Sequence, residues 1–338
     1  MNLFKAELHR IARRRLTLLF GLLAVGALLV MTAIMWFNSS TGPSGADLAA
    51  AQEMADAANA QYETCAADED YFAAPDSEYS WVEEDPVLGE MPHEQACAEL
   101  FWGDSQPEDF IYVYTFQFDQ EGVFLLIGVA IVTGLLVMLL AASAIGAEWS
   151  SGGMANLMVW HPNRLKVWGA KLAAALVLCA VAVAAMLVLA FALLYLTASV
   201  RGDTGTMDGP WWEHTLARVG RTAVLALGMT VIGSALAMLG RHTAIAGGVI
   251  VGYLTVGELL VTFVRFGASG IKYPDLLSLY TWIGAWIEGR MRLDHWDPVT
   301  GASDPMVLTA TDAGLLLGAI MLVFAGLATW SFAKRDAA

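Results

Sequence analysis

The chain has 338 residues, of which 57% are hydrophobic and 15% are charged, and its mean hydropathy is +0.56. This composition excludes a soluble domain of this length and predicts a membrane protein that crosses the bilayer several times. The net charge of −15 does not favour nucleic-acid binding, because twenty of the 33 acidic residues lie in one stretch, residues 38–121, that contains no Lys or Arg.

Residues 1–15 precede the first long apolar run and are predicted to form an amphipathic helix on the membrane surface. Leu3, Phe4, Leu8 and Ile11 recur near helical spacing, and most positions between them are basic or polar. Their apolar face is expected to lie on lipid, with an ordinary basic flank of a transmembrane helix as the alternative. A cleaved signal peptide is disfavoured, because the apolar run that follows is about 22 residues long and no convincing small-x-small cleavage site follows it.

Six segments are apolar and long enough to cross the hydrocarbon core as helices, which takes about 20 residues each. None alternates polar with apolar residues at period two, so the predicted fold class is an all-α polytopic membrane protein and not a barrel. An even number of spans puts both termini on one side. The expected spans are residues 16–37, 122–147, 167–198, 215–239, 243–266 and 311–332.

Basic residues set the predicted orientation, since short loops rich in Lys and Arg stay in the cytoplasm. They occur before the first span, between the second and third, between the fourth and fifth, and in the tail at residues 333–338. We therefore expect both termini in the cytoplasm and the acidic segment outside it.

The acidic segment 38–121 is predicted to be a large extracytoplasmic loop or cap. Residues 46–65 are rich in Ala and expected to be helical, whereas the rest carries several prolines among aromatic residues. Cys65 and Cys97 both lie here and are expected to form a disulfide in an oxidising compartment, with metal binding alongside His93 as the weaker alternative. The acidic side chains would either collect cations or only keep the segment solvated.

Residues 148–166 are predicted to lie in the cytoplasm between the second and third spans. Met154, Leu157 and Met158 can share one face of a short helix, and the HPN sequence at 161–163 would end it. Such a helix would be held between two membrane helices, so a force on it would reach both.

These features together resemble the ABC-2 type permeases, the membrane subunits of a large group of ATP-driven transporters. The resemblance rests on ELHRIARRRLTLLFGLLAVGALL at the start, GAEWSSGGMANLM at the end of the second span, the following VWHPNRLKVWGAKLAAA, and the six spans. It implies a separate ATPase subunit, because this chain has no G-x-x-x-x-G-K-[ST] motif to hold the phosphates of ATP. ATP and Mg are expected on that partner, and this chain is expected to bind no cofactor and to be no enzyme.

The same resemblance implies that the E-x-S-x-G-x-x-x-N-L-like pattern is a coupling element that contacts the ATPase. By match to this pattern, the role falls on Glu148, Trp149, Gly152, Asn156 and Leu157, and the break that follows adds His161, Pro162 and Arg164. Ordinary helix-boundary chemistry is the alternative explanation of these residues.

Charged residues inside the predicted spans are few, and each is a pointer to function. Glu258 in the fifth span and Arg221 in the fourth lie at similar depth and are predicted to form an ion pair. The pair would either hold the two helices in register or bind substrate. Residues 267–310 are rich in aromatic residues such as Trp296, which suit an outer membrane interface. The family resemblance implies a re-entrant or lid segment here, and an amphipathic surface helix is the alternative.

We therefore expect the membrane-spanning permease subunit of an ABC exporter in the cytoplasmic membrane of a bacterium. It would pair with a second permease copy, identical or related, and export an amphiphilic substrate such as a drug, a peptide antibiotic or a lipid, as in drug or peptide resistance. The alternatives are export of a cation such as sodium, and a sensor or scaffold that transports nothing. A secondary transporter would need more intramembrane carboxylates than Glu258.

Overall fold

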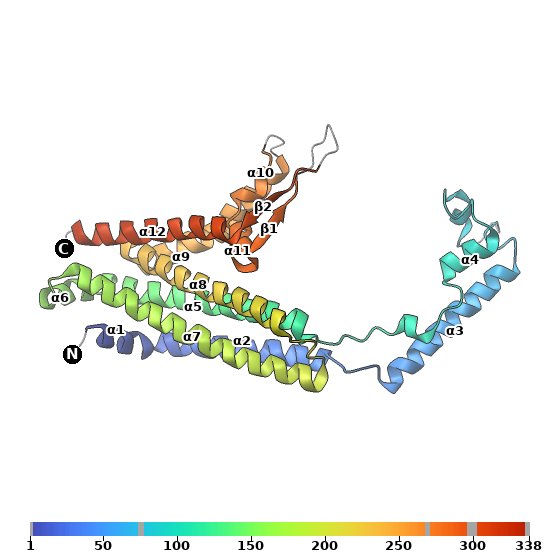
Figure 1. Ribbon diagram of the computed structural model, residues 1–338, viewed down its shortest axis with the longest axis horizontal. Coiled ribbons are helices and arrows are strands. Elements are labelled where there is room, and N and C mark those ends of the chain that lie inside the picture. The colour runs from blue at the N-terminus through green and yellow to red at the C-terminus, as the bar shows by residue number, and fades with distance from the viewer. Residues whose placement is uncertain (1–2, 74–77, 268–270, 296–302, 335–338) are drawn as a thin grey trace. The chain divides into compact units, whose positions relative to one another are not determined.

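The computed structural model describes residues 3–73, 78–267, 271–295 and 303–334 (Figure 1). The chain divides into two compact units. The first, here called the membrane unit, comprises Met1–Ile34, Gln117–Ser199 and Thr204–Ala338; the second, the insert unit, comprises Met35–Phe116 and Val200–Asp203. The division follows the sequence closely, since the insert unit contains nearly all of the acidic stretch, which the hydrocarbon core of a bilayer would exclude.

Five helices within the described residues are long and apolar enough to cross a membrane, and the chain is a multi-pass membrane protein. Figure 1 shows them running lengthwise beside one another. They are α2 (Arg15–Asn38), α5 (Val123–Ser150) with the π-helical turn η3 (Phe118–Gly122) before it, α7 (Arg164–Arg201), α8 (Gly209–Gly240) and α12 (Ala310–Lys334).

The predicted fifth span, 243–266, is helical but not continuous. It consists of α9 (Thr243–Gly252), the π-helical turn η4 (Tyr253–Gly257) and α10 (Glu258–Gly267). Four glycines lie between residues 247 and 257, and glycine weakens an uninterrupted α-helix because it has the most conformational freedom to lose. The prediction of six uninterrupted spans is therefore not confirmed.

Helices α5 and α8 form the centre of the membrane unit. Half or more of their apolar stretches is buried, 50% and 56%, against 17% to 22% in the other three long helices. Their backbones approach closely where glycines leave space: a Cβ placed on Gly134 would lie 2.6 Å from Cβ of Ala226, and one on Gly233 would lie 2.4 Å from Cγ of Met138.

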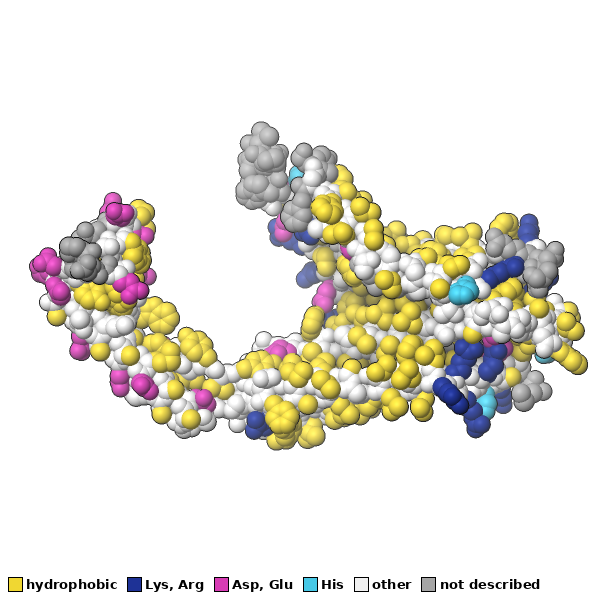
Figure 2. All heavy atoms as spheres, turned by 180° about the vertical axis from the view of Figure 1, so that it is seen from behind, with side chains coloured by type: hydrophobic (Ala, Val, Ile, Leu, Met, Phe, Trp, Pro, Cys, Tyr) yellow, Lys and Arg dark blue, Asp and Glu magenta, His cyan; other side chains and the backbone are white. Residues whose placement is uncertain are grey.

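One end of the membrane unit carries two short helices, α1 (Leu3–Ala12) and α6 (Gly153–Trp160). The space-filling view shows Lys and Arg side chains gathered at that end (Figure 2). The sequence predicted that the apolar stripe of α1 lies on lipid, but part of this stripe packs on other helices of the protein. Ile11 is buried and packs with Leu140 and Ala144 of α5 and with Ala174 of α7.

Between α10 and α12 the described residues form no membrane-crossing helix. They comprise η5 (Pro274–Leu277), α11 (Leu279–Glu288) and the strands β1 (Arg290–Leu293) and β2 (Met306–Thr309). The strands are antiparallel, with Arg290 opposite Thr309. Trp296 lies outside the described residues, and the predicted tail 333–338 is described only as far as Lys334.

The insert unit folds around its own small core. Its elements are α3 (Gly45–Ala67), η1 (Ser80–Glu84), α4 (His93–Phe101) and η2 (Pro107–Phe110). Ser44 begins α3 in a capping box with Asp47, which satisfies backbone N–H groups that the first turn leaves unpaired. Cys65 and Cys97 form the disulfide that the sequence predicted, and it lies within the apolar core of this unit.

Candidate functional site

The predicted coupling segment, 148–166, covers the end of α5, all of α6 and the start of α7. A sharp turn separates α5 from α6, and Gly152 at this turn has φ of +71°, in the left-handed region that glycine adopts without steric penalty. After α6, the HPN sequence at 161–163 interrupts the helical run, and α7 begins at Arg164. The segment is thus a short helix connected directly to two long apolar ones.

Helix α6 has one buried and one exposed face. Met154 is fully buried, and Leu157 and Met158 pack beside it against a cluster formed by the ends of the long helices. Val159 and Trp160 lie on the other side and are 80% and 78% exposed. Val159 and Trp160 thus form an exposed apolar pair at the basic end of the membrane unit.

Glu148, the first residue of the coupling pattern, does not belong to this surface. Its side chain is buried, and Lys171 Nζ of α7 lies 2.5 Å from its Oε2. The other oxygen pairs with Arg10 of α1. The carboxylate already has its cations inside the protein and does not reach the surface in this conformation, so the contact of Glu148 with a partner chain stays a prediction.

A second carboxylate, Glu7 of α1, completes a cluster of four charges. Lys171 Nζ lies 2.9 Å from Glu7 Oε1, and Arg10 Nη2 lies 2.5 Å from Glu7 Oε2. Glu7, Glu148 and Lys171 are each at most 5% exposed. Two carboxylates and two cations make the cluster neutral and fully paired, which is the condition under which charges are tolerated in a protein interior.

The cations also control the ionisation of Glu7. Burial by itself raises the pKa of this carboxyl, but the adjacent Lys171 and Arg10 outweigh burial, and the pKa of Glu7 lies below its ordinary value. Glu7 is therefore ionised at neutral pH. The cluster joins α1, α5 and α7 at the level where the coupling segment begins.

Glu7 and Lys171 are members of this charge cluster that the sequence reasoning did not select as site residues. Glu7 follows Leu3 and Phe4 at helical spacing and precedes Ile11, so it is an acid within the apolar stripe of α1. Lys171 follows the buried Val167 and Trp168 in the same way on α7. A charge on an otherwise apolar helical face is the signal that would have found both.

Trp149 extends the connections of the segment to two more helices. The guanidinium carbon of Arg241, which follows α8, lies 4.6 Å from the centre of a Trp149 ring, within the range of a cation–π contact. Phe332 of α12 meets Trp149 edge to face at 6.1 Å. Arg164 reaches the same helix end, since its Nη1 donates to the carbonyl oxygen of Phe332 at 3.4 Å.

The remaining predicted coupling residues face outward. Asn156, His161 and Pro162 are exposed, and Gly152 has open space around it. A surface cavity of about 470 Å³ lies between the start of α1 and the 161–170 region, lined on one side by Leu3 and Phe4. The exposed face of α6, this cavity and the HPN break thus lie along one stretch of chain.

The predicted ion pair of Arg221 with Glu258 does not form within the described residues. Arg221 Nη1 donates to the carbonyl oxygen of Ile287 at 3.2 Å, whereas Glu258 accepts hydrogen bonds from the hydroxyls of Tyr253 and Ser278. Arg221 thus bonds to the end of α11 and Glu258 to Ser278, the residue before its start, and not to each other. The arginine of α8 that does pair with an acid is Arg218, with Glu288 of α11 at 2.5 Å.

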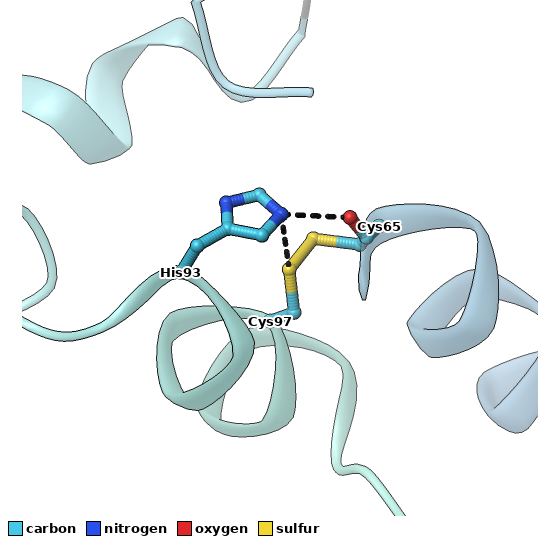
Figure 3. A group of neighbouring side chains, drawn as sticks. All are labelled: Cys65, His93 and Cys97. Atoms are coloured by element: carbon cyan, nitrogen blue, oxygen red, sulfur yellow. Dashed lines mark hydrogen bonds between the residues drawn. A yellow bond between two sulfur atoms is a disulfide. The ribbon is translucent and has the colours of Figure 1, made fainter. Parts of the chain in front are cut away.

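The insert unit contains a group of potential metal ligands, shown in Figure 3: Cys65, His93 and Cys97, whose ligand atoms lie within 4.8 Å of one another. His93 Nε2 is 2.8 Å from the carbonyl oxygen of Cys65 and 3.5 Å from Sγ of Cys97. The two sulfurs are bonded to each other, and a metal ligand must be a free thiolate. In this oxidised state the group is a structural cross-link.

Comparison with known proteins places the whole of this architecture in one family. A family model described as "ABC-2 family transporter protein" matches residues 1–337. None of the curated proteins matches the chain.

Proposed function

The chain belongs to the ABC-2 transporter family, and we propose that it is the permease subunit of an ATP-driven exporter that moves an amphiphilic substrate out of the cytoplasm. In this proposal a separate ATPase subunit binds ATP and Mg and performs the hydrolysis. The family supports a membrane subunit with an ATPase partner, and the almost entirely apolar long helices support a substrate with a large apolar part.

The observation that carries the proposal is the exposed apolar face of α6. Val159 and Trp160 lie on a helix too short to cross a membrane, at the end of the molecule where basic residues gather (Figure 2). A solvent-exposed tryptophan of this kind is a typical energetic centre of a protein interface. The ATPase subunit is proposed to cover this face, together with Asn156 and the HPN break.

Glu148 takes an internal role in this mechanism. When the ATPase moves α6, the force passes through the turn at Gly152 into α5 and through residues 161–163 into α7. The cluster of Glu7, Arg10, Glu148 and Lys171 holds the ends of these helices and of α1 together, so that they move as one body. A buried, fully paired charge cluster suits this task because separating its members is strongly unfavourable.

The proposal also includes the orientation of the chain in the membrane and the number of subunits. The basic end with α1 and α6 is assigned to the cytoplasm, with both termini, and the acidic insert unit to the outside. A second permease copy, identical or related, would complete the pathway, with two ATPase subunits beneath the pair.

The test is purification of the tagged chain in a gentle detergent from its own host, with identification of the proteins that accompany it. A P-loop ATPase is expected with the wild type. Trp160→Ala should lower its recovery or its coupling at least tenfold, because truncating a central interface tryptophan removes about 2 kcal/mol or more. The matched control is Trp330→Ala, which truncates another exposed tryptophan, on α12.

Two results would contradict the proposal. One is a wild-type chain that works without any ATPase partner. The other is a Trp160→Ala variant that retains and stimulates the ATPase as well as Trp330→Ala does.

A further inference from the structure

A second feature of the membrane unit lies away from the coupling segment. A partly open cavity of about 280 Å³ is lined by residues of α5, α8, α9, α11 and α12 together with Tyr253. Every residue that lines it is Leu, Ile, Val, Met, Phe or Tyr. Its size is just below the range of about 300–1,000 Å³ that is usual for small-molecule sites, so it suits a compact apolar group.

Tyr253 connects this apolar wall to a carboxylate. It lies in the π-helical turn η4, and its hydroxyl donates to Glu258 Oε1 at 2.6 Å. The hydroxyl of Ser278 donates to the other carboxylate oxygen at 2.8 Å, and the backbone N–H of Leu279 donates to the Tyr253 hydroxyl at 3.2 Å. The interruption of the helix at η4 thus coincides with the place where the carboxylate is held, as π-turns often do at functional sites.

Glu258 differs from the acids of the membrane unit that join helices through ion pairs. Glu7 and Glu148 have Lys171 and Arg10, and Glu288 has Arg218. Within the described part of the chain, the partners of Glu258 are neutral hydroxyls and no cation. A carboxylate at an apolar site without a counter-charge favours the binding of a cation from outside the chain.

We propose that this cavity binds an organic cation, with its apolar body among the side chains of α5, α8 and α12 and its cationic group at Glu258. Tyr253 and Tyr280 line the same cavity, and an aromatic ring attracts a positive group placed over its face. A lipid acyl chain or a helix of a second copy would fill an apolar space equally well, but neither would use the carboxylate. The charge therefore decides between these occupants.

This inference rests on the proposed function in one respect: it names the class of exported substrate as cationic amphiphiles. The binding step itself needs no ATPase. Binding is tested on the purified full chain alone. A negative binding result would therefore not contradict the ATPase partner, and a missing ATPase partner would not contradict the binding site.

The probe is a short alkyl trimethylammonium that carries a dansyl fluorophore, titrated onto the chain in detergent. Its partner is the neutral analogue in which carbon replaces the quaternary nitrogen, so that only the charge differs. The wild type is expected to bind the cation more tightly than the neutral analogue. Glu258→Gln should weaken binding of the cation about tenfold and leave the neutral analogue unchanged, because it removes the charge and keeps the shape.

Two further variants keep the result interpretable. Glu288→Gln removes a carboxylate at the far end of α11 that already has a cation, and it should leave both affinities unchanged. Ile283→Trp fills the cavity without altering Glu258, and it should weaken both probes. If Glu258→Gln fails to fold, Tyr253→Phe serves in its place, since it removes the hydroxyl that joins the cavity to the carboxylate.

Equal affinity of the wild type for the charged and neutral probes would overturn the proposal and would identify the cavity as an apolar, lipid-filled space. Loss of binding in Glu288→Gln as large as in Glu258→Gln would overturn it as well. If the cavity is instead covered by a second copy, Ile283→Trp would dissociate the dimer in light scattering and change neither affinity, which also contradicts it.

Discussion

Glu7, Glu148 and Lys171 are among the few charged residues that the protein buries almost completely. None of the three would be stable alone in an apolar interior, because an unpaired buried charge is strongly unfavourable. Together with Arg10 they compensate one another, and the residues that meet come from positions as far apart as 7 and 171. The cluster therefore forms only where the ends of α1, α5 and α7 are in contact.

The lowered pKa of Glu7 predicts a specific dependence of stability on pH. The ionised form favours the folded state, so its contribution is fully present above the ordinary carboxyl pKa of about 4.3 and is lost as pH falls through the lower, folded value. At pH 7, Glu7→Gln should lower the free energy of unfolding by about 2 kcal/mol, the scale of a hydrogen bond to a charged group.

The measurement is the melting temperature of the purified variant and wild type from pH 7 to about 3.5. The difference between them should shrink at the acidic end. Glu53→Gln, which changes an exposed acid of the insert unit, is the control and should melt with the wild type throughout. A gap between Glu7→Gln and wild type that does not change with pH would contradict the assigned ion pairs.

At the scale of elements, the central pair α5 and α8 depends on two glycines that meet small or flexible neighbours. Gly and Ala are abundant in the spans, which permits close helix packing, but many of the glycines have nothing near them. Gly134 has Ala226 within contact distance, whereas Gly128, six residues earlier on the same helix, has no neighbouring atom within 4 Å of a Cβ built on it. Only the packing distinguishes the two positions.

Gly134 and Gly128 together provide a matched test of the contact between α5 and α8. Both Ala substitutions gain the same helix propensity, so their difference reports packing alone. Gly134→Ala should destabilise the protein by about 1–3 kcal/mol relative to Gly128→Ala, because the new Cβ would lie 2.6 Å from Cβ of Ala226. Thermal unfolding monitored by size-exclusion chromatography measures this, and equal melting of the two variants would mean that α5 and α8 do not pack this closely.

The predicted fifth span, residues 243–266, contains a break that its hydrophobic pattern does not reveal. Its hydropathy is that of a span, but its glycines permit the π-turn at Tyr253–Gly257 where the hydroxyl of Tyr253 meets Glu258. Two further hydrogen bonds hold this turn, and both come from residues later in the chain. Ser278 donates to Glu258, and the backbone N–H of Leu279 in α11 donates to the hydroxyl of Tyr253. A break of this kind is set by those partners as much as by local propensity.

At the scale of the whole molecule, the chain consists of two units with opposite chemistry. The membrane unit is apolar with a basic end, and the insert unit is acidic with a small core around one disulfide. A core this small is marginal by itself, and carboxylates that repel one another weaken it further. The disulfide is the cross-link that offsets this weakness.

The double variant Cys65→Ser/Cys97→Ser should therefore destabilise the insert unit and spare the membrane unit. The cysteines are 32 residues apart, and a loop of that size predicts a loss of about 3–4 kcal/mol. Limited proteolysis should cut the double variant within residues 35–116 while the long helices stay intact. Cys179→Ala, which leaves the disulfide in place, is the control; uncut insert units in both variants would show that the core does not need the bridge.

The sequence by itself indicated the membrane class, five of the long apolar helices and the acidic insert, and it favoured the disulfide over metal binding. These follow from local composition and spacing, which a single stretch of chain contains in full, whereas the coupling role of 148–166 came from the family resemblance and stays a prediction. Only the tertiary structure decided that Glu148 faces inward to Lys171, that α1 packs on protein, and that Glu258 meets hydroxyls and not Arg221. The reason is physical: periodicity states which face of a helix is buried, but the rotation and depth of each helix against its neighbours decide which charges meet there.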